Sequence, residues 1–190
     1  MADPSRRAVL LGLALTPLAA RAQQPGFVID WQGGPETPAV AQSLAAQIAL
    51  VRALRIRPDI AAFFAAQPVT VDLAEGTRTR AGPRGVFFER ASMPPDNPVL
   101  LHELLHRYHL LRLPQGRQNT TVIAFYDQLR AAALWPAQAY MFTNPFEFFA
   151  MVASVVLHGR AARPPSSRAE VRDKAPALYR WIVDEFGLET

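Results

Sequence analysis

The pattern of apolar and polar positions changes twice in the first half of the chain. In residues 38–56, apolar side chains recur every three or four residues, which is typical of one face of a helix. Pro58 and Pro68 bracket a second short helical segment, DIAAFFAAQ. The pattern then switches to strand-like alternation in VTVDLAE (69–75), and GVFFER (85–90) follows after the turn-forming stretch GTRTRAGPR. We therefore expect two helices followed by an antiparallel pair of strands.

Two strands alone make a marginal sheet, so we expect a third strand at FVIDWQ, residues 27–32. After residue 91 the pattern becomes helical. Asn97 and Pro98 form a typical helix start, as cap and first helical residue, before the segment VLLHELLHRYH. The order of elements predicts an α+β fold, in which a small antiparallel or mixed sheet packs on the HELLH helix and a mainly helical C-terminal half follows. Further helices are expected at 121–135, 145–158 and 176–186, with a loop at 113–120 and a linker at 163–167.

The first residues have the pattern of an export signal. Ser5, Arg6 and Arg7 precede the apolar run AVLLGLALTPLAA, and small residues flank Arg21 at the two positions that a signal peptidase inspects. The paired arginines resemble a twin-arginine (Tat) signal, although a Sec signal can also carry them. A membrane anchor is the alternative, but this run of 13 residues is too short to span roughly 30 Å of hydrocarbon comfortably. We expect residues 1–22 to be removed and the mature protein to be periplasmic or secreted, without stable membrane insertion.

Composition limits the class of protein that residues 23–190 can form. Half of the 190 residues are apolar and 19% are charged, which fits a single compact domain over residues 23–190. Removal of residues 1–22 lowers the formal charge from +4 to +2, because three arginines and one aspartate leave. This charge is too small to indicate a nucleic-acid partner. Cysteine is absent, so disulfides are excluded and any metal must be bound by His, Asp or Glu. The oligomeric state cannot be derived from these features.

His102, Glu103 and His106 form an HExxH motif on an apolar helix. Residues four apart in a helix differ by about 40° around the axis and roughly 6 Å along it, so both imidazoles can reach one ion. Glu103 then lies beside that ion, where it can act on a metal-bound water. The alternative is a core helix with satisfied histidines, in which Glu103 pairs with Arg107 four residues later.

A catalytic zinc site needs a third protein ligand and an open position for water. His109 lies on the same helix face, but it is seven residues from His102, roughly 10 Å further along a rigid helix, which strains tetrahedral geometry. Glu147 is the better candidate, because it opens a second helix and is the sole acidic residue between Asp127 and Glu170. With Asn144 as N-cap, Glu147 also occupies the glutamate position of a capping box, so both roles stay open.

The pair of motifs HELLH and NPFEFFA resembles the gluzincin branch of the zincin metallopeptidases. Tyr140, seven residues before Glu147, is similar to the tyrosine of the anthrax toxin lethal factor type of catalytic domain. The resemblance covers roughly residues 85–155. It implies a zincin-like fold, one Zn²⁺ ion bound by His102, His106 and Glu147, Glu103 as general base and Tyr140 as donor to the oxyanion. Met151 departs from thermolysin-like members, which have an acidic residue at this position.

These features predict a zinc-dependent peptidase that acts on a peptide or protein substrate. The alternative is an exported zinc-binding protein without turnover, in which the site is structural or the surface binds a partner. A further hypothesis makes GVFFER the edge strand that pairs with an extended substrate. It requires that strand to lie at the edge of the sheet.

Overall fold

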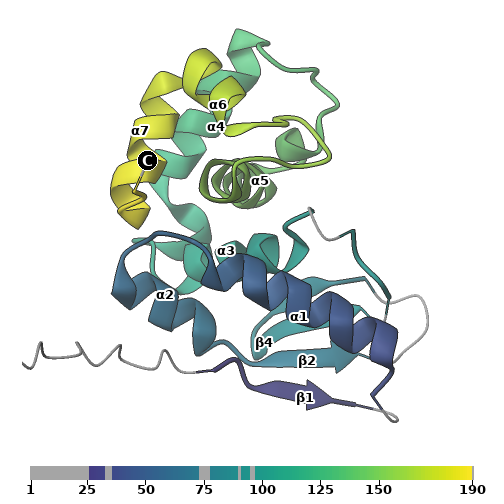
Figure 1. Ribbon diagram of the computed structural model, residues 1–190. Coiled ribbons are helices and arrows are strands. Elements are labelled where there is room, and N and C mark those ends of the chain that lie inside the picture. Colours follow the sequence, from purple (N-terminus) through teal and green to yellow (C-terminus); the bar gives the residue numbers. More distant parts are fainter. Residues whose placement is uncertain (1–25, 33–35, 73–77, 90, 95–96, 190) are drawn as a thin grey trace, which may run out of the picture.

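The computed structural model describes residues 26–32, 36–72, 78–89, 91–94 and 97–189, so the expected signal peptide lies outside the described residues. Figure 1 shows helix α3 at the centre, with the sheet and two helices on one side and the C-terminal helices on the other. The elements are β1 (Ile29–Trp31), α1 (Pro38–Arg52), α2 (Pro58–Ala65), β2 (Val69–Asp72), β3 (Arg80–Gly82), β4 (Gly85–Glu89), α3 (Val99–Leu111), η1 (Gly116–Gln118), α4 (Thr120–Ala132), η2 (Tyr140–Phe142), α5 (Pro145–His158), α6 (Arg168–Lys174) and α7 (Pro176–Phe186).

The fold is α+β with a small mixed sheet, as the sequence predicts. The strand order is β1-β2-β4-β3, and β1 lies within the stretch expected to supply a third strand. None of the described helices has both the length and the apolar character that a membrane span requires. Apolar side chains from the sheet and the helices pack into one hydrophobic core that surrounds α3.

The prediction of an antiparallel pair between 69–75 and 85–90 is wrong. β2 and β4 are neighbours, but they run parallel, with Val69 beside Val86. The antiparallel partner of β4 is β3, which lies inside the stretch GTRTRAGPR where the sequence indicates a turn. β3 has three residues, Arg80, Ala81 and Gly82, which are too few to show an alternating pattern, so the sequence pattern conceals it.

β4 therefore lies between two neighbours, and the hypothesis that GVFFER is an edge strand for substrate is wrong. The close approach of β4 to the residue before β2 depends on Gly85, which has φ +150°. A Cβ atom at this position would collide with the Pro68 carbonyl oxygen, which accepts the N–H of Val86 at 2.8 Å. The outer strand on this side of the sheet is β3.

Helix α3 begins at Val99, and its cap differs from the expected one. Pro98 occupies the N-cap position, and Asn97 does not cap the helix with its side chain. The buried Gln47 of α1 supplies the missing acceptor instead, because its Oε1 accepts the Leu100 N–H at 3.1 Å. Its Nε2 donates to the Asn97 carbonyl at 2.8 Å. The Gln47 side chain, about 50 residues away in the sequence, thus provides the hydrogen-bond acceptor for the first turn of α3.

The C-terminal helices follow their local sequence signals closely. Asn144 caps α5 by accepting the N–H groups of Phe146 and Glu147, and Gly159 ends the helix in the left-handed conformation. Gly187 ends α7 in the same way. The structure adds α6, a short helix capped by Ser167 that the sequence pattern does not reveal.

Arg107 joins α3 to the sheet and does not pair with Glu103. Its Nε donates to Gln67 Oε1 at 2.9 Å, and its Nη1 donates to the carbonyls of Gly82 and Pro83 at 2.7 and 2.8 Å. The side chain is buried, so these acceptors depend on it for their hydrogen bonds. Arg107 therefore fixes the β3–β4 turn on α3.

The substitution Arg107→Met tests this role. It keeps much of the apolar stem but leaves two turn carbonyls and the Gln67 amide without their donor. We expect the free energy of unfolding to fall by about 2–4 kcal/mol, measured by urea denaturation. Arg172→Met is the matched control, since Arg172 is exposed and pairs with its neighbour Asp173; its effect should stay within about 0.5 kcal/mol. Equal stabilities of the two variants would contradict the assigned role.

Candidate metal centre

Three potential metal ligands converge between α3 and α5. Glu147 Oε2 lies 3.1 Å from His102 Nε2 and 3.3 Å from His106 Nε2. One ligand atom from each of the three side chains lies within 4.8 Å of the others. The helical spacing of HExxH places both histidines on the face of α3 that meets the first turn of α5. The structure thus brings together the three residues that the sequence predicts as ligands.

The donor set and its spacing fit a tetrahedral metal ion. Bonds of 2.0–2.1 Å from zinc to nitrogen or oxygen place two tetrahedral ligand atoms about 3.3 Å apart. The two His–Glu distances, 3.1 and 3.3 Å, match this edge. His106 and Glu147 are 5% and 20% exposed, so an ion here would be mostly shielded from bulk water. A polar cluster of this kind is costly to bury without a cation or protons to balance it.

The protonation states are those of a ligand set. Burial alone would raise the pKa of Glu147, but hydrogen bonds and charges of His102 and His106 lower it well below its usual range. Burial lowers the pKa of His106. Glu147 is therefore ionised and His106 favours its neutral form, which are the states in which they bind metal.

The first turn of α5 bears on the two roles of Glu147 that the sequence leaves open. Asn144 Oδ1 accepts the backbone N–H of Glu147 at 2.9 Å, so the N-cap is present. The Glu147 carboxylate, however, extends to the two histidines. The cap thus fixes the backbone of Glu147, and its side chain remains available to the histidines, so the two roles are compatible.

Glu103 lies next to the cluster and is held by the outer strand. Its Oε2 accepts the backbone N–H of Ala81 in β3 at 2.6 Å. Burial raises the pKa of Glu103 to about 7, although the charge of His102 and the Ala81 N–H act in the opposite direction. A carboxyl group with this pKa can both accept and release a proton near neutral pH.

Tyr140, in η2, also lies beside the cluster. Its ring centroid is 6.3 Å from that of His102. Burial, together with the charge of Glu147 and a hydrogen bond to it, raises the pKa of Tyr140 to about 12. The hydroxyl therefore keeps its proton and can act as a donor at the cluster.

His109 lies outside the cluster, as the helical spacing predicts. It is fully buried against the rings of Phe146 and Phe149, at centroid distances of 5.2 and 4.9 Å. Among the described residues, none offers either ring nitrogen a partner with good hydrogen-bond geometry. Burial lowers the pKa of His109 to about 4. It is a neutral packing residue beneath the metal site.

Two cavities reach the cluster, and each is lined by one of its two histidines. The larger, about 640 Å³, lies between β3, η1 and the start of α5, and it contains His106 and Glu147. The smaller, about 200 Å³, contains His102 and is lined by Met151 of α5. Glu103 and Tyr140 line both cavities, so an extended molecule in this cleft would pass beside both side chains.

The sequence does not reveal several residues of this cleft. Phe146 stacks on His106 with centroids 4.1 Å apart, and Arg117 and Arg163 line the two cavities. Phe146 lies in the NPFEFFA motif, directly before Glu147, which is the one signal that could indicate its position. The two arginines lie on loops and share no motif with the ligands.

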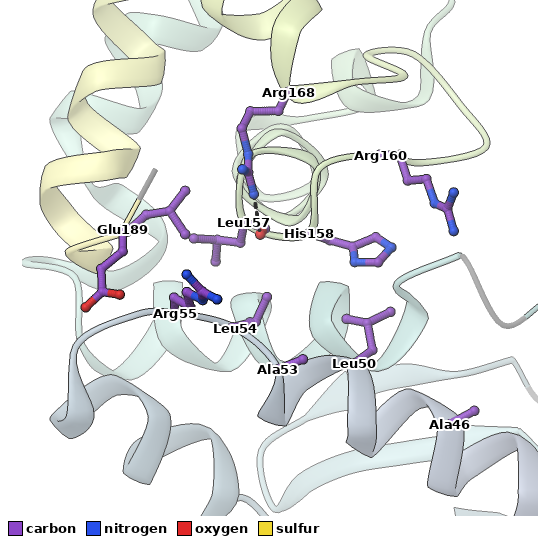
Figure 2. A pocket seen from close by; sticks show the side chains of 11 residues that line it. Ala46, Leu50, Ala53, Leu54, Arg55, Leu157, His158, Arg160, Arg168 and Glu189 are labelled. Atoms are coloured by element: carbon purple, nitrogen blue, oxygen red, sulfur yellow. Dashed lines mark hydrogen bonds between the residues drawn. The ribbon is translucent and has the colours of Figure 1, made fainter.

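A separate pocket of about 550 Å³ lies away from the metal cluster, between the ends of α1 and α5 (Figure 2). Figure 2 shows the Arg168 guanidinium pointing at the carboxyl end of α5, where it donates to the carbonyls of Val156 and Leu157 at 2.6 and 2.8 Å. Arg55 and Arg160 also line this pocket. Cations at helix C-termini balance the partial negative charge of the terminal carbonyls. The arginine Arg168 in this pocket is therefore explained by its role in capping the C-terminus of α5.

Comparison with protein-family models gives no match, and no curated protein matches the sequence. Among solved structures, the chain is similar to the Pro-Pro endopeptidase PPEP-2 from Paenibacillus alvei, with a TM-score of 0.60 and 16% sequence identity. The similarity covers 84% of this chain and 97% of that chain. At this identity the likeness establishes a shared fold.

His109→Leu separates packing from metal binding. Because the pKa of His109 is lowered from 6.5 to about 4, the folded protein binds fewer protons than the unfolded chain between these values. The contribution of His109 to stability is complete above pH 6.5 and is lost as the pH falls to 4. This loss, on the order of 3 kcal/mol, should be absent in His109→Leu, as measured by urea denaturation from pH 7 to 4 with chelator.

Metal binding provides the second measurement. His109→Leu should bind zinc as the wild type does, whereas His106→Leu should lose the ion. Loss of zinc from His109→Leu would instead indicate that His109 is a metal ligand.

Proposed function

We propose that this protein is a zinc-dependent peptidase of the gluzincin type, with His102, His106 and Glu147 as ligands of one Zn²⁺ ion. The observation that carries the proposal is the convergence of these side chains beside Glu103, in a cleft open on two sides. A structural zinc site is closed by four protein ligands, whereas a catalytic site has three and an open position. Within the described part of the chain, three ligands converge here. This favours catalysis over a purely structural role.

The residues divide the chemistry among them. When bound, zinc lowers the pKa of a water to about 7 and polarises the carbonyl of the scissile bond. Glu103 accepts the proton of the attacking water and later delivers it to the leaving amine, for which a pKa near 7 is suited. The protonated hydroxyl of Tyr140 donates to the carbonyl oxygen as negative charge develops on it.

We propose that β3, and not GVFFER, is the strand that pairs with substrate. The Ala81 N–H points away from β4 and into the cleft, where it now meets Glu103. Thr79, Arg80 and Ala81 line the larger cavity. An extended peptide can therefore lie along β3 and place its scissile bond beside Glu103.

The export signal expected at residues 1–22 sets the proposed location. We place the reaction in the periplasm or outside the cell, on a peptide or protein substrate. The structurally similar protein is a Pro-Pro endopeptidase, so a test library for this chain includes peptides with and without adjacent prolines.

Two variants should distinguish zinc binding from peptide hydrolysis. Glu103→Gln should keep one zinc per chain, because Glu103 is not a ligand, but lose peptide hydrolysis by about 10²–10⁴-fold. Glu147→Ala should lose both zinc and activity. Metal analysis and a peptide-library assay on the same samples measure this. Activity of Glu103→Gln equal to the wild type would favour the alternative of a zinc-binding protein without turnover; full zinc occupancy in Glu147→Ala would refute the ligand set.

Tyr140→Phe tests the oxyanion donor. It removes the hydroxyl and keeps the ring, so zinc content and KM should stay near wild-type values while kcat falls by about 10²–10³-fold. Tyr179→Phe is the matched control, since Tyr179 lies on α7 and lines neither cavity of the cleft. If kcat were the same in both variants, the hydroxyl of Tyr140 would have no role in the chemical step.

A further inference from the structure

Three arginines line the cleft, Arg80 and Arg117 in the larger cavity and Arg163 in the smaller one, and two of them, Arg117 and Arg163, lie over aromatic rings of the site. Arg117 belongs to η1 and lines the larger cavity together with His106 and Glu147. Arg163 belongs to the loop after α5 and lines the smaller cavity, with His102. Each ligand histidine therefore has an arginine on its side of the cleft.

Each of these two exposed arginines lies over an aromatic ring of the cleft. The Arg117 guanidinium lies 4.4 Å from the centroid of the Phe146 ring, and this ring stacks on His106 at 4.1 Å. On the other side, the Arg163 guanidinium lies 5.4 Å from the centroid of the Tyr140 ring, whose own centroid is 6.3 Å from that of His102. The same order of arginine, aromatic ring and ligand histidine thus occurs twice.

A guanidinium that uses its face on a ring keeps its N–H groups available at the edge. No described carboxylate lies within salt-bridge distance of Arg117 or Arg163. The carboxylates described in the two cavities are Glu103 and Glu147. Glu103 accepts from Ala81 and Glu147 is bound to the histidines, so neither balances the arginines. Neither guanidinium thus forms an ion pair with a described carboxylate.

We infer that the substrate is an acidic peptide, with a carboxylate side chain on each side of the scissile bond, bound by Arg117 on one side and Arg163 on the other. The inference rests on the proposed peptidase function, because it takes the scissile bond to lie beside Glu103. A planar guanidinium binds a carboxylate through two parallel N–H groups, which gives direction as well as charge. The larger cavity also contains Arg80 and Gln118, so it offers further donors to an acidic side chain.

Charge-reversal variants test this substrate class. The peptides carry Glu, Gln or Lys in turn at each of three positions on either side of a cleaved bond. An exposed ion pair changes binding by a factor of up to about five, so replacing attraction by repulsion changes it more. We expect the wild type to prefer Glu over Lys by about tenfold in kcat/KM at one position on each side. Arg117→Glu should reverse the preference on one side only, and Arg163→Glu on the other.

Controls make each outcome decisive. Arg172→Glu changes charge equally on α6, where Arg172 pairs with Asp173, and should keep the wild-type preferences. Melting temperatures show whether each variant folds, and the preference should weaken at high salt. A wild type that cleaves peptides but does not distinguish Glu from Lys overturns the inference and leaves the peptidase function intact, as does an unchanged preference in both arginine variants.

Binding provides a measurement that does not depend on turnover. Fluorescence anisotropy of labelled peptides measures binding to zinc-loaded Glu103→Gln, which should bind Glu-containing peptides more tightly than Lys-containing ones. A triple variant that also carries Arg117→Glu and Arg163→Glu should lose this preference. If the wild type cleaves no peptide, the proposed function fails, and this binding preference still decides the charge inference. Equal binding of acidic and basic peptides overturns it.

Discussion

The fold depends on the burial of one helix, α3, that carries three histidines, a glutamate and an arginine. α3 lies between the sheet and α5, and its residues Leu100 to His109 are buried apart from the partly exposed His102. Buried polar groups without partners cost several kcal/mol each, so Glu103, His106 and Arg107 need partners from the surrounding elements. The identity of these partners determines how the rest of the chain packs on α3.

Each partner lies on a different element, and together they align the two halves of the protein. Arg107 binds the turn between β3 and β4, and Glu103 binds the backbone of β3. His102 and His106 meet Glu147 of α5 on the opposite side. Gln47 of α1 completes the start of the helix. The contacts that satisfy α3 therefore also place an outer strand, the proposed general base Glu103 and the proposed third ligand Glu147 around one point, so the site forms as the chain folds.

The part of this arrangement that the sequence reveals is the part encoded locally. The HELLH helix and the capped helix at Asn144 follow from residues a few positions apart, and Glu147 could be chosen because no other carboxylate competes with it in that region. β3 could not be found, because three residues become a strand only through their pairing with β4 and their contact with Glu103. Whether β2 and β4 run parallel depends on where the chain crosses between them, which alternation of side chains does not encode.

The arginines of the cleft were hidden for a different reason. Arginine accounts for 19 of the 190 residues, so Arg117 and Arg163 on loops carry no distinguishing signal. Their role depends on the rings of Phe146 and Tyr140, which come from elsewhere in the chain. Side chains that act on substrate through position on a loop are the least visible in a single sequence.

Packing takes the place of a hydrogen bond at His106. Histidines that bind metal usually donate their second nitrogen to a carboxylate or carbonyl, which orients the ring. Here His106 Nδ1 has no such partner among the described residues. The ring is held instead by Phe146, stacked 4.1 Å away, and by the edge of His102 at 4.6 Å. Without a carboxylate to strengthen its basicity, His106 depends on shape for its orientation, and the aromatic residue before Glu147 becomes as important to the site as a hydrogen-bond partner would be.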